Sequence, residues 1–235
     1  MRPIVAFFDV DGTLTRGHVW QGIMAYFRRH GLRRWTHRLF WAYHFPLFLL
    51  YKARVLPQRI ARGQWAQHLA WYVRGYSEQQ ADAVWDWVVN AYLANQWRPV
   101  SLARLRWHQE QGHQVVLVSS GPQPLMARVA RQLGVQHVVA TPFEVRDGRY
   151  TGRAQAPVIG PEKPRRAWAY VRAQGWDARP EDAWAYGDAI SDLPLLESVG
   201  HPVAVAPDAE LANVARSRNW PILTDDAASP TPSQG

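Results

Sequence analysis

Short apolar segments alternate with longer segments of mixed character along most of the chain. The apolar runs predict strands at residues 4–8, 114–118, 135–140, 182–186 and 203–206. The mixed segments predict helices at residues 123–133, 164–174, 193–198 and 211–218. Residues 143–152 carry Asp147-Gly148 between two short extended pieces, which predicts a hairpin. Strands that alternate with helices indicate an α/β fold in which helices flank a parallel sheet on both faces.

The segment between the first two predicted strands breaks this alternation. It predicts helices at residues 18–30, 35–52, 56–73 and 78–96, with breaks at Gly31, Pro57 and residues 75–77. Ser77 and Gln80 have the spacing of a capping box. We therefore expect a core of residues 1–14 and 99–224, a helical insertion of residues 15–98, and a disordered tail of residues 225–235, which are small, polar and proline-bearing.

Charge is distributed unevenly between these units. The chain has 235 residues and a formal net charge of +8. Residues 15–98 carry 12 Lys or Arg against three acids, and eight of the 13 tryptophans, whereas the remainder carries 15 basic residues against 16 acids. The whole positive excess therefore lies in the insertion, as expected for a separate structural unit.

Two features that the sequence lacks, cysteine and a signal-peptide pattern, bear on the cellular compartment and on the chemistry of the protein. The chain has no cysteine, which excludes disulfides and thiolate metal sites. Residues 1–3 lead directly into the first apolar run, without the basic and long apolar regions of a signal peptide. We expect a cytoplasmic location.

Two acids follow the first predicted strand. Asp9 and Asp11 lie two residues apart, before the turn at Gly12 and Thr13, and alternate residues of an extended segment point to the same side. Open α/β sheets bind ligands at the carboxyl ends of their strands, so this pair suits divalent-metal chemistry on a phosphate. The plainer interpretation is a turn at Asp11-Gly12 beside a surface acid.

Polar groups also follow the second strand. The hydroxyl of Ser119 and the backbone N–H groups of Ser120 and Gly121 could hold a phosphate at the start of the next helix. In isolation, a helix-cap or turn serine is the preferred interpretation of this segment.

Two further motifs lie downstream. Lys163 begins a predicted helix, and Asp188 and Asp192 follow another predicted strand, after Gly187. A solvated lysine and an N-capping Asp192 are the alternatives. Taken together, these side chains offer what phosphoryl transfer requires, which is a nucleophile, positive charge and a proton donor. Because a phosphate dianion repels a carboxylate nucleophile, we expect Mg²⁺ to bridge the two.

The order of these motifs resembles the haloacid dehalogenase (HAD) superfamily. More narrowly, the chain is similar to subfamily IB, the SerB-like relatives of phosphoserine phosphatase, over residues 4–206. The helical insertion after the first motif and the hairpin at residues 143–152 also match that pattern. The resemblance implies a Rossmann-like core with a C1-type helical cap, and a phosphatase that acts on a small phosphorylated substrate.

The resemblance also implies a role for each motif residue. Asp9 would be the nucleophile that forms a phosphoaspartyl intermediate, and Asp11 the general acid and then the general base. Mg²⁺ would bind the carboxylates of Asp9 and Asp188 and the backbone carbonyl of Asp11. The remaining roles would be phosphate binding by Ser119 and Lys163, shaping of the turn by Gly12 and Thr13, and orientation of Lys163 or a metal-bound water by Asp192.

Substrate identity is where this chain departs from the family pattern. Phosphoserine phosphatases have a glutamate shortly after the first motif that contacts the substrate's amino group, and here that place holds His18. An imidazole cannot replace a carboxylate as counter-ion to an ammonium, so we do not expect phosphoserine as the substrate. Our hypothesis places His18 at the distal end of the substrate. The same residues would also serve a phosphotransferase that uses an alcohol as acceptor.

The insertion interleaves basic and aromatic residues. The basic ones are Arg28, Arg29, Arg33, Arg34, Arg38, Lys52, Arg54, Arg59 and Arg62, and the aromatic ones are Trp35, Trp41, Tyr43, Phe45 and Phe48. In one interpretation arginines coat the cap while aromatics fill its core. In the other, the cap lies on an anionic membrane surface, as in a lipid-phosphate phosphatase or a lipid-binding protein. Nucleic-acid binding is not expected, because no nucleic-acid motif is present.

The most apolar part of the insertion is residues 39–51. It is shorter than the roughly 20 residues that span a bilayer. We expect a buried helix of the cap.

Overall fold

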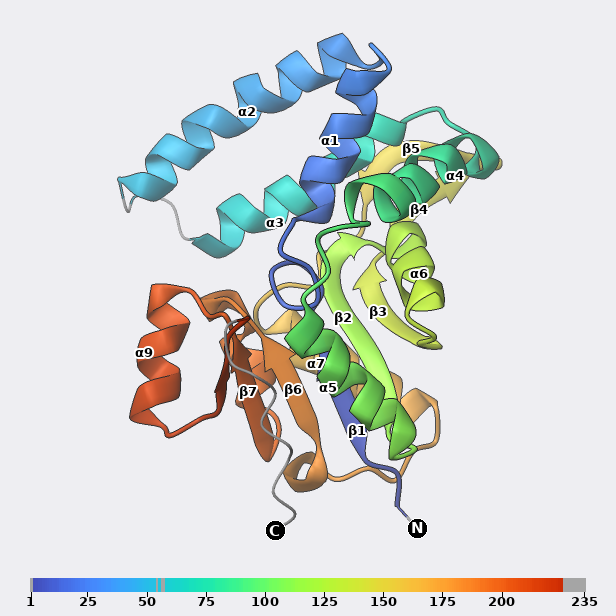
Figure 1. The fold of residues 1–235 in the computed structure, drawn as a ribbon. Coiled ribbons are helices and arrows are strands. Elements are labelled where there is room, and N and C mark those ends of the chain that lie inside the picture. The colour runs from blue at the N-terminus through green and yellow to red at the C-terminus, as the bar shows by residue number, and fades with distance from the viewer. Residues whose placement is uncertain (1, 54, 56–57, 226–235) are drawn as a thin grey trace.

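A six-stranded parallel sheet forms the centre of the molecule in the computed structural model, which describes residues 2–53, 55 and 58–225 (Figure 1). Its order is β3-β2-β1-β6-β7-β8. The strands are β1 (Val5–Phe8), β2 (Gln114–Pro122), β3 (His137–Thr141), β6 (Trp184–Gly187), β7 (His201–Val205) and β8 (Ile222–Leu223). Because β1 pairs with both β2 and β6, the strands that carry the three main motifs end side by side.

Helices cover both faces of the sheet. One face packs against α7 (Glu162–Ala173), α8 (Leu193–Leu196) and α9 (Ala209–Ser217), and the other against α5 (Pro99–Glu110) and α6 (Gln123–Gln132). Alternation along β1 produces the two cores, because Val5 and Phe7 point to the first face and Ala6 and Phe8 to the second. The predicted α/β fold with a flanked parallel sheet is confirmed.

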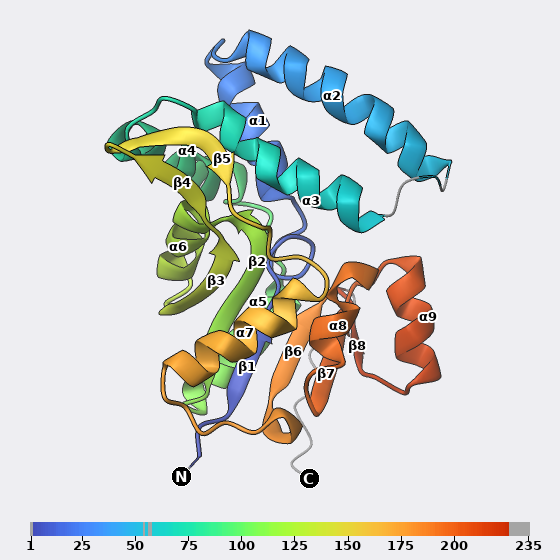
Figure 2. The same ribbon diagram turned by 180° about the vertical axis from the view of Figure 1, so that it is seen from behind.

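The residues between β1 and α5 are mostly helical. They form α1 (Val19–Arg29), α2 (Arg34–Lys52), α3 (Gln58–His68), the 3₁₀ segment η1 (Leu69–Val73), α4 (Glu78–Trp87) and the π-helical turn η2 (Val88–Tyr92). Helices α1, α2 and α3 lie beyond the carboxyl ends of the strands (Figures 1 and 2). The capping box of Ser77 and Gln80 forms in both directions. The boundaries of this unit stay a prediction.

The predicted hairpin consists of β4 (Phe143–Arg146) and β5 (Arg149–Ala154). Its two turn residues, Asp147 and Gly148, have φ angles of 51° and 68°. Positive φ at both positions is the geometry that a tight hairpin turn requires, and it explains the Asp-Gly pair.

The chain crosses between sheet and insertion at two points that pair with each other. Arg16 N–H donates to the Gln96 carbonyl at 2.7 Å, and Arg98 N–H donates to the Leu14 carbonyl at 2.9 Å. Arg98 also donates through Nε to the Gly12 carbonyl at 2.7 Å. The two crossings therefore form one short neck beside the first motif.

The burial expected for residues 39–51 is wrong. These residues lie in α2, where only Phe40 and His44 are buried, and Trp41, Tyr43, Phe45 and Phe48 are exposed. Apolar side chains occur all around this helix, and only one of its sides can pack against α3 and η1. The interpretation that aromatics fill the core of the cap is wrong for these positions.

Other differences from the predicted elements are smaller. Helix α5 and strand β8 were not expected, and the predicted helices that end at residues 73 and 96 change to 3₁₀ and π geometry before they end. Arg54, Pro57, the side chain of Arg59 and tail residues 226–235 lie outside the described residues. Asp225, where the predicted tail begins, pairs with Arg98 at 2.5 Å. None of the described helices is long and apolar enough to cross a membrane.

Candidate active site

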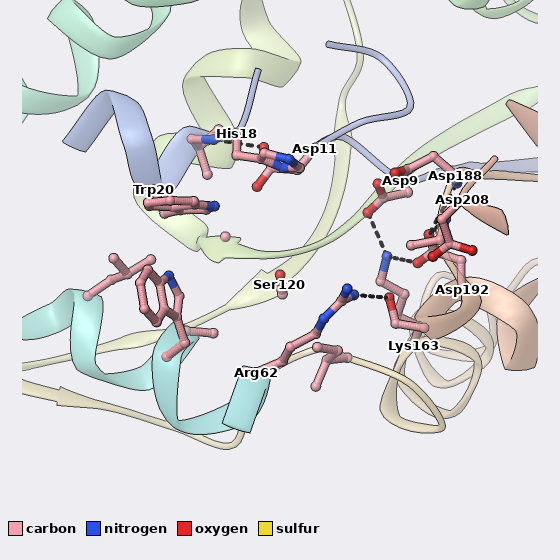
Figure 3. Close-up of a pocket in the computed structure, with 18 residues that line it drawn as sticks. Asp9, Asp11, His18, Trp20, Arg62, Ser120, Lys163, Asp188, Asp192 and Asp208 are labelled. Carbon is pink, nitrogen blue, oxygen red and sulfur yellow. Dashed lines mark hydrogen bonds and ion pairs between the residues drawn. The ribbon is translucent and has the colours of Figure 1, made fainter. Parts of the chain in front are cut away.

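A cavity of about 440 Å³ opens at the carboxyl ends of β1, β2 and β6 (Figure 3). Its floor comes from the loops that follow these strands and from α7. Its opposite wall comes from the insertion, through residues of α1, α3 and η1. The cavity therefore lies at the place where the sheet topology and the motif order both predict a site.

A buried lysine joins two of the predicted acids. Lys163 Nζ lies 2.6 Å from Asp9 Oδ1 and 2.5 Å from Asp192 Oδ1, and all three side chains are buried (Figure 3). Burial lowers the pKa of Lys163, but Asp192 and Asp9 outweigh burial and raise it above its ordinary value. Burial raises the pKa of Asp9 to about 6, against the opposing effect of Lys163. The lysine thus stays charged and neutralises part of the charge of the two acids.

Asp188 packs against the turn of the first motif. Thr13 Oγ1 donates to Asp188 Oδ1 at 2.9 Å. Gly12 has φ +91°, and a Cβ there would lie 2.1 Å from Asp188 Oδ2, so only glycine fits. Burial, with Asp9 and Asp192 as further causes, raises the pKa of Asp188 to about 9. Gly12 and Thr13, the two turn residues predicted to shape the phosphate site, therefore both contact Asp188.

Three acids could hold a metal ion. Asp9, Asp188 and Asp192 each offer an oxygen within 4.8 Å of the others. One lysine cannot balance the charge of these three carboxylates, two of which are buried and one half-buried. Burial first, and then the neighbouring charges of Asp9 and Asp192, raise the pKa of Asp188. Oxygen ligands from carboxylates are those that hard divalent cations prefer, so the residues present fit such a cation.

Asp11 occupies a different part of the cavity from these acids. Its carboxylate accepts a hydrogen bond from the Val19 N–H at 2.9 Å, at the start of α1. Burial raises the pKa of Asp11 to about 7. A carboxyl group with such a pKa can both donate and accept a proton near neutral pH. Its side chain is not one of the three that cluster for a metal, and the metal role expected for Asp11 concerned its backbone carbonyl.

The two serines in the last part of β2 differ in position. Ser120 and Gly121 line the cavity. Ser119 is only 1% exposed, and its Oγ accepts a hydrogen bond from the Gly121 N–H at 3.0 Å. The hydroxyl of Ser119 therefore supports the backbone in the last part of β2 and lies behind the cavity surface.

The wall from the insertion is aromatic and basic. Trp20 and Trp65 meet edge to face with ring centroids 5.1 Å apart, and His18 lies beside Trp20. Arg62 donates to Ser191 Oγ of the core at 3.1 Å, so it links the two sides of the cavity. Burial, followed by the charge of Arg62, lowers the pKa of His18. His18 lines the cavity, and its position at the distal end of the substrate stays a prediction.

Some cavity residues were missed as site residues by sequence reasoning. Trp65, Arg62 and Asp208 belong to no motif. Asp208 accepts hydrogen bonds from the Ile190 and Leu211 N–H groups at 3.0 and 2.8 Å, and so holds the loop of Asp188 against α9. The sequence offered one signal for Asp208. It lies between a predicted strand and a predicted helix, where Asp is a favoured N-cap.

The structure is that of an α/β protein with a cluster of acids around one lysine at the ligand-binding edge of its parallel sheet, and this cluster could hold a divalent cation. The model of the haloacid dehalogenase-like hydrolase family matches residues 6–197. The chain belongs to this family, as the motif order predicts.

Relatives with known names agree with this assignment. The chain is similar to a probable phosphatase of Mycobacterium tuberculosis, with 38% identity over 117 residues, which are 50% of this chain and 40% of that protein. It is also 30% identical to a phosphoserine phosphatase of the same species over 229 residues, which are 92% of this chain and 69% of that protein.

Solved structures share the fold. A protein of unknown function from Bordetella pertussis has a TM-score of 0.78 and 26% identity, over 95% of this chain and 99% of that one. The match to the probable phosphatase covers only 40% of that protein, so the activity of this chain depends on the evidence of its own site.

Proposed function

We propose that the protein hydrolyses a phosphomonoester in two steps through a phosphorylated Asp9, with Mg²⁺ as cofactor. The observation that carries the proposal is the convergence of Asp9, Lys163, Asp188 and Asp192 on one cavity. Motifs separated by more than 100 residues along the chain thereby meet around the predicted nucleophile.

In the first step, a carboxylate oxygen of Asp9 attacks phosphorus and the bond to the leaving oxygen breaks. Asp11 donates its proton to that oxygen, so an alcohol departs. In the second step, Asp11 takes a proton from water, and the water oxygen displaces Asp9 from phosphorus. Inorganic phosphate leaves, and both carboxyl groups return to their initial protonation states.

The remaining polar groups would bind the phosphate and hold the acids in place. Lys163 fixes Asp9 and would supply positive charge to the phosphate, while Ser120 and Gly121 line the cavity. Asp9 and Asp188 would hold Mg²⁺, with Asp192 close enough to contribute, and the ion would neutralise the charge between substrate and nucleophile. Ser119 supports the backbone of Ser120 and Gly121 in the last part of β2.

The wall of the insertion supports a substrate other than phosphoserine. Among the described residues that line this wall there are Arg62 and His18 but no acid. An ammonium group would therefore find no counter-ion there, whereas an apolar or anionic leaving group would contact Trp20, Trp65 and Arg62. This favours a substrate without a free amino group beside the phosphate.

The test is hydrolysis of p-nitrophenyl phosphate by the purified chain, with Mg²⁺ and after removal of metal with EDTA. We expect turnover that requires Mg²⁺, and a loss of at least about 1,000-fold in kcat for Asp9→Asn, because the nucleophile is removed. Asp182→Asn, which changes an exposed acid, is the matched control.

Two results would refute the nucleophile. One is near-normal kcat in Asp9→Asn, and the other is the absence of a hydroxylamine-sensitive phosphoryl label on the wild-type chain during turnover. Asp11→Asn should still accept the label, but release it more slowly.

A further inference from the structure

The side of α2 that faces away from the protein is apolar. Phe40 and His44 are buried against the neighbouring aromatic side chains of α3 and η1. The opposite side carries Trp35, Leu39, Ala42, Phe45, Pro46 and Leu49, which recur at helical spacing and which we call the outer stripe. Helix α2 is the outermost layer at this end of the molecule in both views (Figures 1 and 2).

The exposure of the outer stripe is high. The exposed fractions are 72% for Trp35, 63% for Leu39, 55% for Phe45 and 51% for Leu49. Single exposed apolar residues are common on protein surfaces, but a contiguous stripe of large ones marks a surface that another body covers.

Basic residues lie on α2 itself and at the end of α1, the helix before it. Arg34 and Arg38 lie on the first turns of α2, Lys52 on its last, and Arg28 and Arg29 at the end of α1; all five are exposed. Arg38 lies over the ring of Trp35 at 4.9 Å, and Lys52 over that of Phe48 at 5.7 Å. No Asp or Glu occurs between residues 12 and 77, so no acid of this segment offsets the charge.

We propose that the outer stripe of α2 binds the anionic surface of a lipid bilayer. Helices that lie in a membrane interface combine a long apolar side with Arg or Lys beside it, and aromatic rings at the level of the headgroups. Each basic residue near an anionic surface adds to the electrostatic attraction. A bilayer also accepts an extended, convex row of side chains without a complementary groove.

A second copy of the chain fits this surface less well. In a two-fold dimer through the outer stripe, the basic residues of α1 and α2 in one copy would face those of the other, and no acid of the segment could separate them. The stripe is separate from the cavity, so its occupant can be tested without reference to catalysis.

The first experiment tests the apolar side chains of the outer stripe. It measures how much of the full chain floats together with lipid vesicles. One set is phosphatidylcholine alone, and the other contains about 30% phosphatidylglycerol. We expect binding to the anionic set, and a loss of tenfold or more in the double variant Phe45→Glu with Leu49→Glu. Val145→Glu, which alters an exposed apolar residue of the β4–β5 hairpin, should bind like wild type.

The charge arm uses neutral substitutions. Arg34→Gln with Arg38→Gln should lower affinity for anionic vesicles about tenfold. Arg131→Gln with Arg172→Gln, at exposed positions of α6 and α7, should leave it unchanged. Circular dichroism confirms that each variant is folded, and Trp35→Ser replaces the glutamate pair if that pair unfolds the chain.

Three outcomes would overturn the proposal. The first is wild type that fails to float with anionic vesicles. The second is equal loss of binding in the outer-stripe variants and their controls. The third is a stable wild-type dimer by light scattering that Phe45→Glu with Leu49→Glu converts to monomer, because the stripe would then be an interface between copies.

Discussion

The floor of the cavity and the outer face of α2 distribute polar and apolar groups in opposite ways. On the floor, Lys163, Asp9 and Asp192 are buried and bonded to one another. On α2, Trp35 and Leu39 are among the most exposed large side chains. Both arrangements reverse the usual partition between core and surface, and we propose for each a partner outside the polypeptide, which is a divalent cation at the floor and a lipid surface at α2.

The largest effect on stability is expected from removing the buried cation. Lys163→Met leaves Asp9 and Asp192 buried without their partner, which should lower the free energy of unfolding by about 3–5 kcal/mol in EDTA. Urea denaturation measures the change. Lys52→Met, which replaces the other lysine of the chain at an exposed position, should change it by less than about 0.5 kcal/mol.

A double variant sharpens this test. Adding Asp192→Asn to Lys163→Met removes one of the two unpaired acids, so part of the lost stability should return. If Lys163→Met and the double variant are equally stable, Lys163 does not stabilise the protein through its ion pair with Asp192.

The second effect comes from a buried imidazole in the core below the site. His108 Nε2 lies 2.9 Å from Tyr186 Oη, and its Nδ1 lies 2.7 Å from that of His113. Burial, with His113 and Arg104 as further causes, lowers the pKa of His108 from 6.5 to about 3. Below pH 6.5 the unfolded chain binds a proton that the folded chain excludes, so stability is lost as pH falls towards 3.

This loss should reach on the order of 3 kcal/mol between pH 7 and pH 4. Urea unfolding across that range measures it. His108→Gln should flatten the dependence, while His201→Gln, at an exposed position, should leave it steep. An unchanged slope in His108→Gln would assign the acid sensitivity to other groups.

A third test separates backbone strain from close contact. Gly12→Ala places a Cβ 2.1 Å from Asp188 Oδ2 at φ +91°, and should cost about 2 kcal/mol or more. Gly112→Ala has a similar φ of 72° but no atom within 4 Å, and should cost about 1 kcal/mol. Thermal unfolding compares the two, and equal costs would mean that the contact with Asp188 relaxes freely.

The smallest effect is expected on the outer stripe. Trp35→Ala should change the free energy of unfolding by less than about 0.5 kcal/mol, because the ring has little protein around it. Phe40→Ala, one turn further along α2 but fully buried, should cost about 3–5 kcal/mol. A large cost for Trp35→Ala would mean that the stripe is packed against the protein in solution.

The sequence predicts the sheet and the motif residues well, for a physical reason. Strands that are buried on both faces appear as continuous apolar runs, and the polar residues that follow them stand out. Asp9 and Asp188 follow such runs, so the sequence alone predicts that they lie at one edge of the sheet, whereas Lys163 follows no strand and was predicted from the pattern only as the start of a helix. Helix α5 was missed because its polar and apolar residues show little periodicity around Val100 and Leu105.

Contacts across the cavity could not be predicted in the same way. Arg62 and Trp65 reach the site only because α3 folds over it, and residue type alone does not reveal that. The same limit explains α2, where apolar character predicted burial. Which side of a uniformly apolar helix is covered depends on the size of its neighbours, and α3 and η1 cover only the side of Phe40 and His44.

The short neck at the base of the insertion has a consequence for how such proteins can diversify. Because Arg16 pairs with Gln96 and Arg98 with Leu14, the chain leaves the sheet and returns to it at almost the same point. The segment between these positions can become longer or shorter, or be exchanged, without pulling β1 away from α5. The neck therefore fixes both ends of the insertion. Different insertions could be attached there while the acids and the lysine at the edge of the sheet stay in place.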